Sequence, residues 1–147
     1  MGDAVVKMKI EPTFENVSAV RLAVQDVCRK QYGWPGAEPL IDELLMAATE
    51  AMNNAVEHSG AKEVEIELIA GARRLVVRVL TAGKRFDPPS EVAFPDLDGP
   101  GGLPEGGFGL AIIREMADAV HYDYCDGKNI VTLEKNISEN EGGQDGN

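Results

Sequence analysis

Strict alternation of charged and apolar residues over positions 62–69 limits the folds open to this chain more than any other feature. Glutamates in this run alternate with three apolar residues, Val64, Ile66 and Leu68. A period-2 pattern predicts a strand with one buried and one solvated face, which is typical of antiparallel sheets. A turn at Gly71–Ala72 leads into a second predicted strand at 75–80, so the two strands form a hairpin whose apolar face needs a covering layer.

The remaining sequence patterns predict the other strands of the sheet and the helices that cover its apolar face. Alternating runs predict further strands at 5–10, 120–124 and 130–134, and Asp126–Gly127 is a hairpin turn signal between the last two. Apolar residues at helical spacing predict helices at 15–32, at 39–58 and from Gly109 onward. The order β-α-α-β-β-loop-α-β-β predicts an α+β fold, a two-layer sandwich of a mostly antiparallel sheet with three helices on one face.

Length and charge narrow the class of protein. A chain of 147 residues is expected to form one domain, here placed at residues 1–136 and followed by an acidic, disordered tail at 137–147. The net charge of −11 argues against binding to nucleic acid or to an anionic membrane. The sequence has no apolar run long enough to span a membrane and no signal-peptide core near its start, so a cytoplasmic protein is expected.

The segment from Thr81 to Gly107 lacks a regular pattern. It contains five of the eight prolines of the chain, at positions 88, 89, 95, 100 and 104. A loop of this length inside one domain is usually functional or disordered. We therefore expect residues 88–107 to be mobile in the absence of a ligand.

A polar stripe marks the second predicted helix, where Glu50, Asn54 and His58 follow one another at intervals of four residues. This spacing places the three side chains on one face of a helix. A carboxylate can act as a general base, and an amide oxygen is a suitable ligand for Mg²⁺ that also binds phosphates. The same spacing is common on solvated helix faces, so the stripe alone leaves both interpretations open.

A glycine-rich segment, Gly106-Gly107-Phe108-Gly109-Leu110, runs directly into the third predicted helix. Glycines let backbone amides approach an anion closely, and the start of a helix carries a partial positive charge. The segment therefore predicts a phosphate-binding loop, although a flexible hinge without a ligand has the same composition. It matches neither a P-loop nor a dinucleotide-binding fingerprint.

Taken together, three motifs resemble the GHKL ATP-binding superfamily and, within it, the bacterial anti-sigma-factor serine kinases. The block from Thr49 to His58 is similar to the N-box of the family, Gly83 to Pro88 to its first glycine box, and Gly107 to Ile113 to the glycine box that closes on phosphates. The resemblance extends over residues 5–135. It implies a Bergerat-type ATP-binding fold.

The resemblance also implies roles for individual residues. Glu50 would be the catalytic base, and Asn54 would bind Mg²⁺. ATP would further contact residues of all three motifs, namely His58, Thr81, Gly83, Arg85, Asp87, Gly107, Phe108, Gly109 and Leu110. Lys84, Arg85 and Arg114 supply positive charge near the expected site of a chain that is otherwise acidic.

By the same resemblance, the protein would be a serine/threonine-protein kinase that takes part in transcription regulation. It would transfer the γ-phosphate of ATP to a serine of an anti-anti-sigma antagonist, and it would also bind a sigma factor and form a homodimer. A histidine kinase catalytic domain fits less well, because the chain has no dimerisation helix with a phosphoacceptor histidine.

The chain departs from the family pattern at two positions. Thr81 stands where the family has an aspartate that binds the adenine amino group, and Arg85 replaces a glycine. A neutral hydroxyl accepts a weaker hydrogen bond than a carboxylate, and loss of the contact to adenine costs about 1–3 kcal/mol. The alternative function is therefore a degenerate GHKL-fold switch that binds a partner but binds ATP weakly or not at all.

Overall fold

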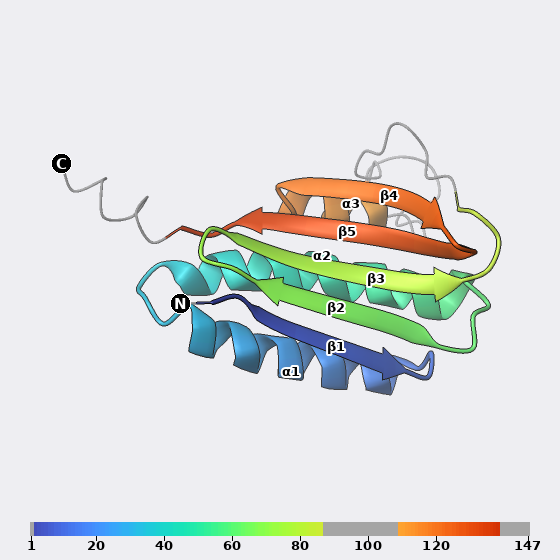
Figure 1. The fold of residues 1–147 in the computed structure, drawn as a ribbon, viewed down its shortest axis with the longest axis horizontal. Coiled ribbons are helices and arrows are strands. Elements are labelled where there is room, and N and C mark those ends of the chain that lie inside the picture. The colour runs from blue at the N-terminus through green and yellow to red at the C-terminus, as the bar shows by residue number, and fades with distance from the viewer. Residues whose placement is uncertain (1, 87–108, 139–147) are drawn as a thin grey trace, which may run out of the picture.

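The structure, a computed structural model, describes residues 2–86 and 109–138. Five antiparallel strands form one sheet in the order β1-β2-β3-β5-β4, and three helices lie against one of its faces (Figure 1). The elements in chain order are β1 (Ala4–Ile10), α1 (Phe14–Gln31), α2 (Ala37–His58), β2 (Val64–Ala70), β3 (Arg74–Ala82), α3 (Gly109–Met116), β4 (Ala119–Cys125) and β5 (Lys128–Asn136). The predicted fold class, element order and placement of the helices are confirmed.

The inner face of the sheet follows the predicted alternation of apolar and charged residues. Val64, Ile66 and Leu68 are fully buried, while the glutamates between them lie on the other face. The predicted end of β3 was wrong, because the strand continues through Thr81 to Ala82 and does not end at residue 80. Pairing on both sides explains the difference, since Thr81 lies opposite Val64 of β2 and Asn129 of β5.

The first two helices cover this face through apolar stripes. In α1 the buried residues are Val17, Val20, Val24 and Cys28, as the helical spacing predicts. Helix α2 begins at Ala37, two residues before the predicted start, and Gly36 precedes it with a φ of 94°. Pro39 lies in the first turn of α2, where a missing N–H breaks no helical hydrogen bond.

The hairpin between β4 and β5 closes with the predicted turn. Asp126 and Gly127 have φ values of 53° and 76°, which are the positive values that a type I′ turn requires. This turn fixes the register of β4 against β5, so that Tyr122 lies opposite Val131 on the inner face.

Ile137 lies one residue beyond the boundary that the sequence suggests for the domain. Its side chain is fully buried, and its N–H donates a hydrogen bond of 2.9 Å to the carbonyl oxygen of Arg73. Residues 139–147 of the expected tail and the expected mobile segment 88–107 lie outside the described residues. Within the described part of the chain, no helix combines the length and the apolar composition needed to cross a membrane.

A lysine on the inner face joins the sheet to two helices. Lys135 of β5 is 6% exposed, and its ammonium lies 2.9 Å from a carboxylate oxygen of Glu43 in α2 and 3.6 Å from one of Asp118. It also donates a hydrogen bond of 2.9 Å to the carbonyl oxygen of Met116, the last residue of α3. Lys135 therefore fixes the carboxyl end of α3 against α2 and β5.

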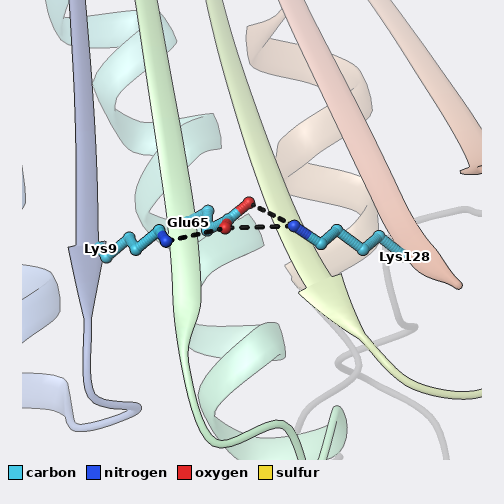
Figure 2. A network of polar contacts seen from close by, with 3 residues as sticks. All are labelled: Lys9, Glu65 and Lys128. Carbon is cyan, nitrogen blue, oxygen red and sulfur yellow. Dashed lines mark hydrogen bonds and ion pairs between the residues drawn. The ribbon is translucent and has the colours of Figure 1, made fainter. Parts of the chain in front are cut away.

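The outer face of the sheet carries an ion-pair network whose three residues extend across four neighbouring strands. Glu65 of β2 lies between Lys9 of β1, at 3.7 Å, and Lys128 of β5, at 3.1 Å (Figure 2). Lys128 reaches Glu65 by crossing β3, which lies between their strands. Hydrogen bonds from Lys128 are the main cause that holds the pKa of Glu65 below its ordinary value of 4.5, and Lys9 contributes further.

Replacing Lys135 with alanine is expected to lower the free energy of unfolding by about 1–3 kcal/mol, because a buried aliphatic stem and its hydrogen bonds are lost. Urea denaturation measures this change. Lys30→Ala is the control, since the side chain of Lys30 is 77% exposed in its pair with Asp26. Such an exposed pair contributes less than about 0.5 kcal/mol. Equal effects of the two substitutions would contradict the role of Lys135.

Glu65→Gln is expected to make the free energy of unfolding less sensitive to acid. A carboxyl whose pKa is lowered by folding stabilises the folded state above its ordinary pKa of 4.5 and loses this contribution as the pH falls through the lowered value. The difference between wild type and variant should therefore shrink as the pH falls below about 4.5 in urea titrations. Glu63→Gln, at an exposed position just before β2, should show no such trend.

Candidate functional site

A cavity of about 560 Å³ lies between the inner face of the sheet and the helices α2 and α3. Residues of β3, β4 and β5 form one wall, α2 and α3 form the other, and residues 84–86 after β3 complete the lining. Its volume is within the range of small-molecule sites. The cavity is therefore the candidate functional site.

The predicted polar stripe borders this cavity. Asn54 and His58 line it, with Ala51 and Ala55 contributing small side chains beside them. Glu50 lies one turn before Asn54 and is half-buried, but it does not line the cavity itself. The imidazole of His58 is 71% exposed and lies 3.6 Å from a carboxylate oxygen of Glu57.

The start of α3 lies directly against Glu50 and Asn54. A methyl group placed on Gly109 would approach Asn54 Oδ1 to 3.3 Å and Glu50 Oε1 to 3.4 Å, so only glycine fits there without displacement of these side chains. Leu110 and Ile113 of α3 line the cavity. Helix α3 thus brings its positive N-terminal end to the two residues of α2 that the sequence marks for chemistry.

The end of β3 supplies the residues of the predicted first glycine box. Thr81 is 7% exposed and lines the cavity. The exposed residues Lys84 and Arg85 also line it. Gly83 has a φ of 149°, a conformation that favours glycine, and its N–H donates a hydrogen bond of 3.1 Å to the carbonyl oxygen of Gly127. Asp87, Gly107 and Phe108, which the sequence also assigns to the site, lie outside the described residues.

Asn129 is a cavity residue that sequence reasoning missed. Its side-chain oxygen accepts a hydrogen bond of 2.7 Å from the backbone N–H of Phe86, and its amide nitrogen donates one of 2.7 Å to the carbonyl oxygen of Lys84. The two bonds attach the segment after β3 to β5. No local motif marks Asn129, because its position opposite Thr81 follows only from strand register.

Tyr122 of β4 is the second residue that the sequence analysis did not assign to the site. Its ring lines the cavity and meets the ring of Phe86 edge to face, with centroids 6.1 Å apart. The hydroxyl is buried and has no hydrogen-bond partner among the described residues. Burial is the main cause that raises the pKa of Tyr122.

The donor set of the cavity fits a phosphate-bound metal better than a metal held by protein alone. Among the described residues, no group of three or more His, Cys, Asp or Glu side chains is placed to hold a metal ion. Asn54 offers one neutral oxygen at the start of α3, and Mg²⁺ in phosphate-transfer sites takes few protein ligands besides phosphates and water. These residues therefore fit Mg²⁺ that arrives with a nucleotide.

Comparison with known proteins identifies the family. The family described as a histidine kinase-like ATPase domain matches residues 10–135, which include every described element of the cavity. The chain belongs to this family. The motifs indicate a resemblance to GHKL proteins and to the anti-sigma-factor kinases. The comparison confirms this resemblance.

Relatives within the family extend over almost the whole chain. Proteins named serine-protein kinase RsbW from Bacillus cereus and Bacillus anthracis are each 30% identical to it over 149 residues, covering 97% of this chain and 91% of the relative. A crystal structure of the RsbU and RsbW domains of a Mycobacterium tuberculosis protein superposes with a TM-score of 0.61 at 17% identity. That match covers 91% of this chain and 33% of the other, and it supports the fold.

Asn129→Ala is expected to release the segment that closes the cavity. Loss of the side-chain acceptor should increase the amide exchange rate of Phe86 by about 2–10-fold, which corresponds to one ordinary hydrogen bond. Hydrogen exchange followed by NMR measures this rate. Asn136→Ala, at the exposed far end of β5, is the control and should leave Phe86 unchanged. Unaltered exchange at Phe86 in Asn129→Ala would show that the segment is held by other contacts.

Proposed function

We propose that this protein is an ATP-binding serine/threonine-protein kinase of the anti-sigma-factor type. The observation that carries the proposal is the convergence of three separate motifs on one cavity. Asn54 and His58 come from α2, Thr81 from the end of β3, and Leu110 from the start of α3. Relatives that extend over almost the whole chain are named serine-protein kinases, which agrees with this activity.

The walls of the cavity suggest how ATP would bind. The sheet wall includes Val79, Val131 and the ring of Tyr122, and the ring of Phe86 lies against that of Tyr122, which suits a planar base. The helix wall offers Asn54 and the N-terminal end of α3, which suit phosphates. Lys84 and Arg85 line the same cavity and add positive charge to a chain whose net charge is −11.

Each chemical role then falls to a residue of this chain. Glu50, half-buried beside Gly109, would accept the proton of the attacking serine hydroxyl. The serine oxygen would then bond to the γ-phosphorus as the bond from that phosphorus to ADP breaks. Asn54 would hold Mg²⁺, which supplies charge neutralisation to the phosphates when bound. Gly107 and Gly109 would offer backbone N–H groups to phosphate oxygens, and His58 would add a donor nearby.

The substrate and partners follow from the same assignment. We propose an anti-anti-sigma antagonist protein as the phosphoacceptor, a sigma factor as a second ligand, and a homodimer as the assembly. Through partner switching among these proteins, the kinase would regulate transcription in the cytoplasm. Binding to nucleic acid or to a membrane is not part of the proposal, since the net charge of −11 opposes both.

A second candidate function rests on Thr81. Its neutral hydroxyl stands where a carboxylate would anchor adenine, so a partner-binding switch with little or no bound ATP is the alternative. Such a protein would keep its binding surfaces without turnover. Glu50, Asn54 and Gly109 remain together in the fold, which favours the kinase.

Calorimetric titration with Mg-ATP tests the proposal directly. We expect wild-type protein to bind with a Kd in the micromolar range, and Asn54→Ala to weaken binding at least about tenfold by removing the metal ligand. Glu50→Gln should bind Mg-ATP nearly as well as wild type, yet lose about 100-fold or more in phosphate transfer to a candidate antagonist, because only the base is removed.

The control for both variants is Asn53→Ala, which changes the neighbouring asparagine of α2 that does not line the cavity. Circular dichroism checks that each variant is folded. Absence of binding by folded wild type at millimolar Mg-ATP would reject the kinase and favour the partner-binding switch.

A further inference from the structure

The sheet wall of the cavity contains an unusual selection of polar groups. Strand register places Val79, Val131 and Tyr122 in one row across β3, β5 and β4, and Thr81 and Asn129 in the next row. All five residues line the cavity. The polar groups on these five residues are thus two hydroxyls and one amide. None of the five side chains carries a carboxylate, an ammonium or a guanidinium group.

The amide of Asn129 is already engaged. Its oxygen and its nitrogen each bond the backbone of the segment after β3, at Phe86 and Lys84, with distances of 2.7 Å. These bonds fix the orientation of the amide. The hydroxyl of Thr81 is consequently the side-chain group on this wall that remains to bond a ligand in the cavity.

The hydroxyl of Tyr122 also lacks a partner among the described residues although it is buried. A buried polar group without a hydrogen bond is costly and therefore uncommon in native proteins. A ligand in the cavity that offers a donor or an acceptor would remove this cost.

Hydroxyls differ from carboxylates in what they can recognise. A carboxylate only accepts hydrogen bonds, whereas the Thr81 and Tyr122 hydroxyls each donate or accept and can rotate to suit the ligand. Adenine presents an amino donor at the position where guanine presents a carbonyl acceptor. An acceptor-only site favours adenine, while a hydroxyl can satisfy either base.

We propose that the cavity binds GTP about as well as ATP, because Thr81 reads the purine edge with a hydroxyl that suits both bases. This proposal rests on the proposed nucleotide-binding function and extends it to the class of nucleotide. Phosphate contacts at Asn54 and α3 are the same for both nucleotides and do not discriminate between them. Thr81 is therefore a specificity-determining residue.

Calorimetric titrations with Mg-ATP, Mg-GTP and Mg-CTP test the proposal on the full chain. Wild type should bind ATP and GTP with Kd values within about fivefold of each other, which is less than one hydrogen bond to a base edge can contribute. CTP should bind more weakly than either purine nucleotide. Thr81→Asp should introduce a group that only accepts hydrogen bonds. The preference for ATP over GTP should then rise to about tenfold or more.

Thr81→Val keeps the test independent of how well a buried aspartate is tolerated. It removes the hydroxyl at nearly constant shape and should weaken ATP and GTP by the same factor, about 2–10-fold. Thr132→Val is the matched control, because Thr132 is also 7% exposed but does not line the cavity. It should leave both affinities unchanged.

The outcomes separate this proposal from the proposed function. Tight ATP binding with GTP at least about 30-fold weaker would overturn the relaxed selectivity and leave the ATP-binding function standing. Loss of ATP affinity alone in Thr81→Val, or CTP binding as tight as that of the purines, would likewise overturn it. Failure of folded protein to bind either purine nucleotide would reject the nucleotide-binding function itself.

Discussion

The packing of α2 against the inner face of the sheet is the interaction on which the rest of the structure depends. The sheet buries one apolar face, and the long helix α2 lies across its centre with residues such as Ile41, Leu44 and Met52 fully buried. Toward its carboxyl end, α2 presents Ala51 and Ala55 to the sheet. Small side chains leave the space unfilled there, and the cavity results. The same helix thus packs into the core with its large side chains and borders the cavity with small ones toward its carboxyl end.

Two side chains of β5 hold the elements that border this cavity, and they do so at opposite ends of the strand. Asn129 attaches the segment after β3 through its amide, while Lys135 joins the carboxyl end of α3 to α2 through Met116 and Glu43. Neither residue is part of a recognisable motif. Their effect is to fix two neighbouring elements in place around a ligand site without occupying it. The proposed kinase activity would depend on such positioning, because phosphoryl transfer is governed mainly by orientation and electrostatics.

Charge is distributed so that an acidic chain can still receive the proposed anionic ligand. The glutamates of β2 are paired on the outer face of the sheet, where Glu65 contacts Lys9 and Lys128. Lys84 and Arg85 lie at the cavity on the other side. Local potential decides whether phosphates can approach, and the net charge of the whole chain does so much less because solvent screens distant charges.

The sequence by itself determined the fold class, the order of the elements and the three motifs of the family, because each depends on local periodicity or on short spacing. It also placed Glu50, Asn54 and His58 on one helix face. Only the tertiary structure decided that β3 continues through Thr81, since pairing with two neighbouring strands sets a strand's end. Likewise, Asn129 and Tyr122 became site residues only through strand register, which brings together positions that are more than 40 residues apart in the chain and leaves no trace in local sequence. Long-range pairing of this kind follows from packing of the whole domain.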